Sequence, residues 1–261
     1  MTMPGTAARP TAAHVEALTR DGYVLVGADA IFDPPFATEL PGWVDEVAGL
    51  PEVPGRWMMY FEQSARDGRR VLNRVESFVD HHAGFSALVT SRLVERWVEG
   101  LVGEPVTLFK DKVNFKSPGG DGFRPHQDAH VWEDLYPGLT SHLTVAVAVD
   151  RATPENGCLE LAPGCHTTGL IGTRMEEIPA DVADRLPWVS VPMEAGDAVI
   201  FGSYAPHRSG PNTTGEPRRM LFLTYNPTGQ GDLRARYFAD KRRSYPPDCE
   251  RLPGTAYHYK I

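Results

Sequence analysis

Short apolar runs separated by turn-forming clusters dominate the second half of the chain. β-like runs lie at 142–149, 157–161, 189–193, 197–201 and 219–226, and the clusters TPENG, APGCH, EAGD and NTTGEP stand between them. This spacing of strand and turn signals is typical of a sandwich or a barrel. The 25 glycines and 23 prolines among 261 residues also favour short strands and turns over long helices. The sequence therefore predicts a mainly β fold.

Two helical patterns and one long strand precede these runs. The segment TAAHVEALTRDGYVLV begins with a threonine cap, Thr11, and its helical pattern ends at Gly22 before an apolar strand-like stretch. Apolar residues recur at three- and four-residue spacing over 85–102, which predicts an amphipathic helix that ends at Gly103. Over 106–116 the period changes to two, which predicts a strand with an apolar-leaning face and a markedly polar face. Helices are therefore expected to flank the β core.

Charge and composition argue against several kinds of partner. The 34 acidic and 26 basic side chains give a net charge of −8, so nucleic acid and anionic membrane surfaces would repel the chain. No apolar run reaches the ~18 residues of a membrane span, and the N-terminus lacks the apolar segment of a secretory signal. Three scattered cysteines suit a reducing compartment. We therefore expect a cytoplasmic protein, a monomer or homodimer, whose partner is a small molecule.

A pair of metal-ligating residue types occurs in the segment FRPHQDAHVW. If this segment is extended, His126 and Asp128 point to the same face and can reach one metal ion. Such a pair can occur by chance, so a third ligand is required, and His207 supplies it 79 residues after Asp128. Two imidazoles and one carboxylate form the facial triad of non-heme iron(II) oxygenases. A zinc site is the less favoured alternative, because the chain has neither an HExxH helix nor cysteines at finger spacing.

Two further polar residues follow His207 closely. Arg218 begins the strand-like run RRMLFLTY, where its guanidinium can project into the same barrel. An iron enzyme that draws its electrons from 2-oxoglutarate needs a cation at the far carboxylate of that co-substrate, and a guanidinium matches a carboxylate with two hydrogen bonds. Ser209 can donate its hydroxyl to the same carboxylate. The alternatives are a surface arginine paired with a loop acid and an ordinary turn serine.

Several motifs in a fixed order resemble one known family. They are DGYVLV, DKVNFK with PGGDGFRPHQD, TPENGCLELAPGCH, EAGDAVIF, PHRSGPN and PRR. Together they are similar to the phytanoyl-CoA dioxygenase (PhyH-like) group of Fe(II)/2-oxoglutarate oxygenases. The resemblance implies a double-stranded β-helix, a cupin-like jelly roll with flanking helices. It departs in one turn, where Cys165 stands in place of the usual serine.

The resemblance also implies a role for individual residues. His126, Asp128 and His207 would bind Fe(II), with 2-oxoglutarate and O2 as co-substrates. Arg218 and Ser209 would hold the tail of 2-oxoglutarate.

Three more residues are assigned to the co-substrate. Asn114 matches a position that contacts the co-substrate in ectoine-hydroxylase-like relatives, and Trp132 matches an aromatic residue beside it. Lys110, four residues earlier on the same face as Asn114, is expected to act likewise.

The aspartate of the triad distinguishes two outcomes known for this family. Halogenating relatives have a small residue at the position of Asp128, which opens a site for chloride, whereas Asp128 fills that site. The resemblance therefore implies hydroxylation or another oxidation of an unactivated C–H bond, with conversion of 2-oxoglutarate and O2 to succinate and CO2. The alternative from another class is a non-catalytic cupin-like metal-binding sensor, which would have no need of Arg218, Ser209 and Asn114.

The substrate class is predicted from the first half of the chain. The segments GRWMMYFE and LNRVESF combine apolar residues with charged or hydroxylated ones where relatives build the substrate entrance, namely Arg56, Tyr60, Glu62, Arg74 and Glu76. With the ending GDLRARYFADKR, they look like a subgroup that includes aminoalkylphosphonate hydroxylases, which implies a small anionic or zwitterionic substrate. His130 is expected near this pocket, because period two places it on the face of His126. Two alternatives stay open: Arg74 and Glu76 could hold the helical layer to the barrel, and the substrate could be a hydrophobic natural-product scaffold in a biosynthetic pathway.

These patterns predict the following organisation. A flexible tail over 1–11 precedes a single oxygenase domain over 12–261. This domain is divided into a helical flank with the substrate entrance (12–103), a jelly-roll core with the metal site (104–227) and a C-terminal extension (228–261). The basic side chains of the extension are expected to form a solvated surface.

Overall fold

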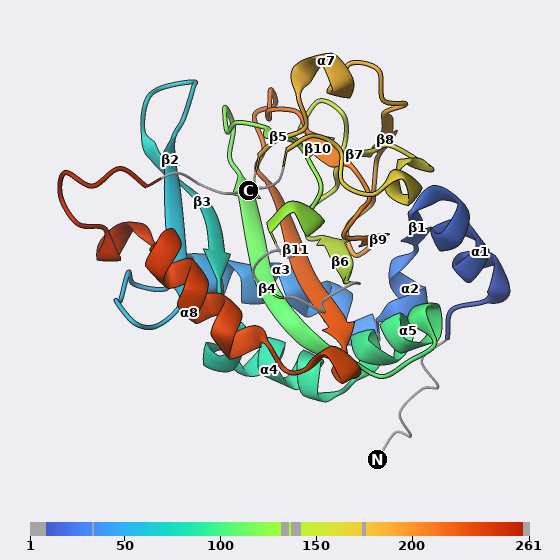
Figure 1. Ribbon diagram of the computed structural model, residues 1–261. Coiled ribbons are helices and arrows are strands. Elements are labelled where there is room, and N and C mark those ends of the chain that lie inside the picture. The colour runs from blue at the N-terminus through green and yellow to red at the C-terminus, as the bar shows by residue number, and fades with distance from the viewer. Residues whose placement is uncertain (1–8, 33, 132–135, 137–141, 174–175, 258–261) are drawn as a thin grey trace.

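Two antiparallel sheets form the core of the computed structural model, which describes residues 9–32, 34–131, 136, 142–173 and 176–257 (Figure 1). The larger sheet has seven strands in the order β1-β9-β6-β11-β4-β3-β2. Its strands are β1 Tyr23–Val26, β2 Met58–Gln63, β3 Arg70–Glu76, β4 Val106–Lys116, β6 Leu143–Ala148, β9 Ala198–Gly202 and β11 Arg218–Pro227. The smaller sheet has four strands in the order β5-β10-β7-β8. These are β5 Phe123–His126, β7 Leu159–Leu161, β8 Val189–Val191 and β10 His207–Ser209.

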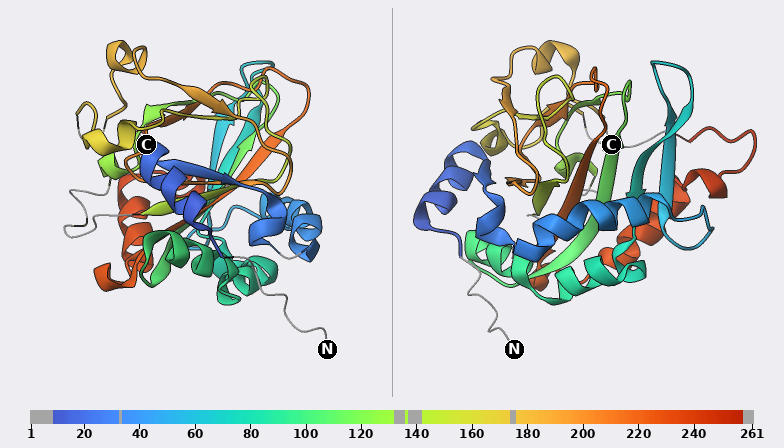
Figure 2. Two further views of the ribbon diagram at one scale, coloured as in Figure 1. Left: turned by 90° about the vertical axis from the view of Figure 1, so that its right-hand side faces the viewer. Right: turned by 180° about the vertical axis from the view of Figure 1, so that it is seen from behind.

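Helices surround these sheets, and Figure 2 shows them from two further sides. The α-helices are α1 Ala12–Asp21, α2 Ala28–Ile31, α3 Pro34–Ala48, α4 Ala83–Thr90, α5 Leu93–Val102, α7 Ala180–Ala183 and α8 Arg234–Ser244. Short 3-10 turns occupy η1 Val79–His81, η2 Cys165–Thr168, η3 Thr228–Gln230 and η4 Asp248–Glu250. None of the described helices is both long and apolar enough to cross a membrane.

The two faces of the larger sheet are buried against different layers. Alternation along β11 sends Leu221 and Leu223 into a core shared with the N-terminal helices, which includes Leu40 of α3 and Trp97 of α5. Met220 and Phe222, at the alternate positions, pack instead with neighbours on β6 and β9 against β7 and β8 of the smaller sheet. The space between the sheets is therefore partly filled by apolar side chains, and the polar face of β4 borders what remains.

Most of the strand signals read from the sequence coincide with observed strands. The run 106–116 is β4 over its whole length, and the run 219–226 lies within β11. The patterns over 12–103 predict mainly helices, so the strands β2 and β3 differ from the expectation for this part of the chain. Both join the edge of the larger sheet beside β4.

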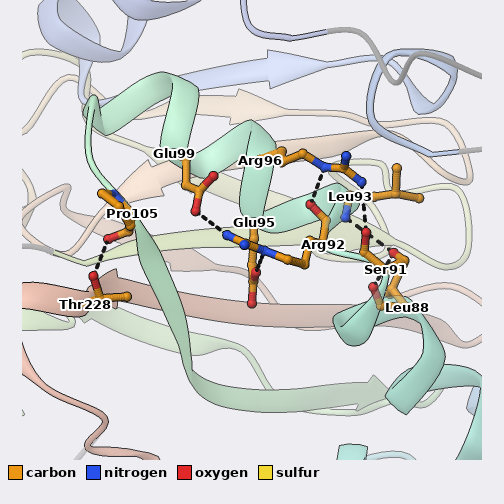
Figure 3. Close-up of polar contacts among 9 residues, drawn as sticks. All are labelled: Leu88, Ser91, Arg92, Leu93, Glu95, Arg96, Glu99, Pro105 and Thr228. Atoms are coloured by element: carbon orange, nitrogen blue, oxygen red, sulfur yellow. Dashed lines mark hydrogen bonds and ion pairs between the residues drawn. The ribbon is translucent and has the colours of Figure 1, made fainter.

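The predicted helix over 85–102 is in fact two helices. Arg92 lies between α4 and α5 with φ 61°, in the left-handed region that a non-glycine residue rarely adopts. Its guanidinium bonds Glu95 at 2.8 Å and Glu99 at 2.6 Å, and the Ser91 hydroxyl donates to a carbonyl of the preceding turn at 2.6 Å (Figure 3). Because both helices bury apolar side chains, the periodic pattern continues across the break and does not reveal it.

The C-terminal extension also differs from the expected solvated surface. Its basic residues lie largely on α8, which lies across β2, β3 and β4 on the side opposite α3 (Figure 1). Lys241 is bonded to the buried Glu76, and Arg234 is paired with the buried Asp111. These charges turn inward because β3 and β4 offer buried carboxylates, which are stabilised by counter-charges.

Candidate metal centre and co-substrate cavity

The two histidines of the predicted triad face each other across two neighbouring strands. His126 ends β5 and His207 begins β10, and they are direct partners in the antiparallel register. Their ring centroids are 4.1 Å apart. One ligand atom from each of His126, Asp128 and His207 lies within 4.8 Å of the others. The structure therefore brings together the three residues that the sequence predicted as metal ligands.

Backbone contacts and burial prepare the imidazoles as ligands. The Nδ1 atom of His126 lies 2.6 Å from the carbonyl of Arg124, and that of His207 lies 3.1 Å from the carbonyl of Ala205. A ring that donates from Nδ1 to a carbonyl presents an unprotonated Nε2 to a metal ion. Burial also lowers the pKa of His126 to about 3 and lowers the pKa of His207, so both rings are neutral near pH 7.

The carboxylate of the triad is held in its ionised form. Burial opposes the ionisation of Asp128, but the neighbouring His207 ring and the Lys110 ammonium outweigh it and hold the pKa of this carboxyl well below its usual range. The set of two neutral imidazoles and one carboxylate fits an Fe(II) ion better than a structural Zn²⁺, which prefers four protein ligands and no open coordination position.

The chain leaves the extended conformation directly after His126. Asp128 lies in a turn, and the amide of Val131 bonds its carbonyl at 3.2 Å. Period two therefore does not extend to His130, which is fully buried with Nε2 3.1 Å from the carbonyl of Ile171. The structure thus places His130 away from the described cavity linings, contrary to the expectation that it faces the substrate.

A narrow cavity between the sheets contains both the triad and the residues predicted for 2-oxoglutarate. Arg218 begins β11 and is 1% exposed; one of its terminal nitrogens donates to the carbonyl of Gly157, while Nε has no hydrogen-bond partner among the described residues. Ser209 ends β10 and lies in the same cavity. Lys110 and Asn114 also line it, and the Asn114 Oδ1 atom is buried without a described partner. Trp132 lies outside the described residues.

Two lysines of this region escaped the sequence prediction. The Lys116 Nζ atom donates to the Ser209 hydroxyl at 2.8 Å and to the Gly157 carbonyl at 3.3 Å. Burial, with the nearby charge of Arg218, lowers the pKa of Lys116 to about 7. Lys112 lines the cavity itself, and burial lowers its pKa also to about 7. The alternation over 106–116 already placed both lysines on the polar face, so the signal was present in the sequence.

A larger cleft of about 740 Å³ adjoins this cavity. The two share His126 and Phe123, so the cleft leads to the candidate metal ligands. Arg74, predicted for the substrate, lines the cleft with Glu62 and Asn73, and the Asn73 amide donates to the Glu62 carboxylate at 2.8 Å.

The other residues predicted for the substrate lie elsewhere. Arg56 is exposed outside the described linings of both cavities. Tyr60 is 2% exposed, and its hydroxyl donates to the carbonyl of Tyr245 at 2.9 Å. Glu76 is fully buried and is bonded by Lys241 at 2.6 Å, with a nitrogen of Arg74 3.0 Å away. Glu76 thus holds side chains inside the fold, as the structural alternative for this residue proposed.

Comparison with known protein families identifies a match over most of the chain. The family model described as Phytanoyl-CoA dioxygenase (PhyH) matches residues 18–220. The methylphosphonate hydroxylase of Gimesia maris is 45% identical over 204 residues, which cover 78% of this chain and 76% of that protein. A 2-aminoethylphosphonate dioxygenase of an uncultured bacterium is 40% identical, with 85% and 84% covered. The family resemblance and the dioxygenase class predicted from the sequence are thereby confirmed.

Solved structures show the same fold. EctD from S. alaskensis, crystallised with 2-oxoglutarate and 5-hydroxyectoine, superposes with a TM-score of 0.71 at 23% identity, covering 88% of this chain and 80% of EctD. The predicted jelly roll is thereby confirmed. The predicted Fe(II) and 2-oxoglutarate agree with the groups bound in EctD structures.

Proposed function

Because the chain belongs to the phytanoyl-CoA dioxygenase family, we propose that it is an Fe(II)- and 2-oxoglutarate-dependent dioxygenase that hydroxylates a C–H bond of a small phosphonate, with or without an amine. One observation carries this proposal: the ligand atoms of His126, Asp128 and His207 converge in a cavity that also contains the buried Arg218. A metal-binding sensor would have no need of a buried guanidinium in the same cavity.

The metal site fits its proposed occupant. His126, His207 and Asp128 supply three donors from adjacent segments, which leaves coordination positions for 2-oxoglutarate and O2. Once bound, Fe(II) supplies the activation of O2 and the oxidation of the C–H bond. The protein contributes the orientation of the imidazoles, through carbonyls that accept from Nδ1, and a buried cavity that limits access of water.

Arg218 and Ser209 would hold the far carboxylate of 2-oxoglutarate. The Gly157 carbonyl restrains one nitrogen of the Arg218 guanidinium, and Nε has no described partner and can donate to a ligand. The Ser209 hydroxyl accepts from Lys116, so its own proton is available for a carboxylate oxygen. Lys116 thereby positions Ser209, and Asn114 offers a further polar group in the same cavity.

The cleft that leads to the triad supports the substrate class. Arg74 lines it and is held between the Glu76 carboxylate and the Tyr60 ring, whose centroid lies 4.4 Å from the guanidinium carbon. A guanidinium fixed in this way suits a phosphonate or another anion. The relatives at 45% and 40% identity are named for methylphosphonate and 2-aminoethylphosphonate, which supports a phosphonate over a lipophilic natural product.

Two measurements test the proposal. Anaerobic addition of Fe(II) and then 2-oxoglutarate to the metal-free protein should produce the weak visible band of the metal-bound keto acid. In air, formation of succinate is then compared across methylphosphonate, 2-aminoethylphosphonate, amino acids, betaines and lipophilic natural-product scaffolds. We expect stimulation by one or both phosphonates. If only lipophilic scaffolds stimulate succinate formation, the tailoring-enzyme alternative replaces the phosphonate substrate.

A further inference from the structure

The lysines of this chain are few and are concentrated at one place. The sequence contains five lysines against 21 arginines. Three of them, Lys110, Lys112 and Lys116, occupy alternate positions on β4, so they share the face that borders the cavity. A fourth, Lys241, reaches the same side of the sheet from α8, where it bonds Glu76. Among the described residues, the exposed basic side chains are therefore arginines, whereas the four lysines lie on the inner side of the larger sheet.

These inner lysines differ in their partners. Lys116 donates to the Ser209 hydroxyl and to backbone carbonyls, and Lys241 is paired with Glu76. Lys112 makes no hydrogen bond or ion pair with any part of the chain that the structure describes. Its Nζ atom lies 4.5 Å from the ring centroid of Phe222 and 5.8 Å from that of Phe123. Aromatic faces attract a cation but satisfy none of its three N–H donors.

An ammonium without a hydrogen-bonding partner is costly where the protein partly shields it from water, as it does the half-buried Lys112. Lys112 nevertheless lines the cavity of the triad, and in the register it lies opposite Phe222 on one side and Glu76 on the other. The Glu76 carboxylate already bonds Lys241 and is close to Arg74. The donors of Lys112 are thus left for a ligand.

The charges lining the cavity indicate what this ligand carries. Lys110, Arg218 and the protonated form of Lys112 are cations and Asp128 is an anion, while Arg208 is paired with Glu160. The charges of a divalent metal ion and of the doubly negative 2-oxoglutarate cancel each other. A positive charge of about two then remains, which a second dianion would neutralise.

We propose that Lys112 binds the anionic head group of the substrate and selects a dianion, such as a phosphonate, over a monoanion of similar shape. This inference rests on the function proposed above. The other candidate ligand of this ammonium is a carboxylate of 2-oxoglutarate. Separate measurements of the affinities for the phosphonate and for 2-oxoglutarate distinguish the two. Lys112 would bind the substrate without taking part in metal binding, so the proposed ligand set stays His126, Asp128 and His207.

The test compares the wild-type protein with Lys112→Met, which keeps the apolar stem and removes the charge. Protein loaded anaerobically with Fe(II) and 2-oxoglutarate is titrated with methylphosphonate and with methanesulfonate, and the visible band is followed. Calorimetry with metal-free protein measures phosphonate binding without the metal. We expect a wild-type preference for the phosphonate, and a loss of phosphonate affinity of about tenfold or more in the variant. The affinity for 2-oxoglutarate should change less than about twofold.

Two controls separate binding from folding. Because Lys112 has no described polar partner, Lys112→Met should keep or raise the Tm of the ligand-free protein. Should this variant fail to fold, Lys112→Gln is used in its place. Arg151→Met removes one exposed positive charge that is paired with Glu194, and it should leave both affinities unchanged.

Three results would overturn the inference. Unchanged phosphonate affinity in a folded Lys112 variant would show that this residue does not bind the substrate, while the proposed function would stand. A selective loss of 2-oxoglutarate affinity would assign Lys112 to the co-substrate instead. If the loaded wild-type protein binds no phosphonate at all, the proposed substrate class fails and the inference fails with it.

Discussion

Two groups of charged side chains lie inside the fold, and they differ in how their charges are paired. In the metal cluster, His126, Asp128 and His207 point their ligand atoms at one another without bonding. In the Glu76 cluster, the Glu76 carboxylate receives two contacts from Lys241, at 2.6 and 2.7 Å, and lies 3.0 Å from Arg74. His126, His207, Glu76 and Arg74 are buried, whereas Asp128 is half-buried.

The difference shows which cluster serves the fold and which serves a ligand. The Glu76 cluster ties α8 to β3, so its charges satisfy one another in the folded chain. The metal cluster directs three donors at one point, an arrangement that costs folding free energy unless an ion is bound. Substitutions should therefore have opposite effects in the two places.

The largest effect is expected in the metal cluster. His126→Ala, Asp128→Ala or His207→Ala should each abolish detectable turnover and retention of Fe(II), because each removes one of three protein ligands. The unfolding free energy of the metal-free protein should not fall. Metal analysis after gel filtration and denaturant unfolding check the two statements. Near-normal turnover in any one variant would remove that residue from the ligand set.

The Glu76 cluster should respond through stability. Glu76→Ala removes the buried carboxylate that pairs with Lys241 and with Arg74, so we expect the unfolding free energy to fall by roughly 3–5 kcal/mol. Denaturant unfolding measures it. Glu52→Ala, which breaks the exposed pair with Arg70, is the matched control and should cost less than about 1 kcal/mol. Equal costs for the two variants would contradict the pairing described for Glu76.

The same cluster predicts a dependence of stability on acid. Burial opposes ionisation of Glu76, but the charges of Lys241 and Arg74 outweigh it and lower the pKa from 4.5 to about 2. A depressed carboxyl pKa contributes stability that is complete above pH 4.5 and is lost as the pH falls towards 2, by roughly 3 kcal/mol in total. Between pH 4.5 and 2, the unfolding free energy of Glu76→Gln should depend less on pH than that of the wild type. Parallel curves would mean that other carboxyls dominate acid unfolding.

A smaller effect is expected at the co-substrate end of the cavity. Arg218→Lys should raise the KM for 2-oxoglutarate about tenfold or more, because an ammonium cannot reproduce a two-pronged carboxylate contact. Lost hydrogen bonds to charged groups account for this size. Arg219→Lys is the control, since Arg219 bonds Asp150 and Asp45 outside the cavity and its replacement should leave this KM unchanged. A raised KM in Arg219→Lys with an unchanged KM in Arg218→Lys would mean that 2-oxoglutarate binds on the other face of β11.

The sequence predicted the metal cluster well because its signals are local or ordered along the chain. His126 and Asp128 are close in sequence, and His207 and Arg218 follow in motifs that a single family shares. The polar face of β4 was also visible as period two. The Glu76 cluster was not predictable in the same way, because Lys241 lies 165 residues from Glu76 and only the packing of α8 joins them.

Local patterns by themselves determined the β character of the chain, the strand β4, the donor types of the metal cluster and the family. Their physical basis is short-range: side-chain alternation, turn chemistry and residue identity act over a few positions. The tertiary structure decided that β2 and β3 join the larger sheet, that His130 turns away from the cleft, and that Lys112 faces the cavity without a described polar partner. Such facts depend on which distant segments pack together, because burial decides whether a charge is neutralised, and no local pattern records burial.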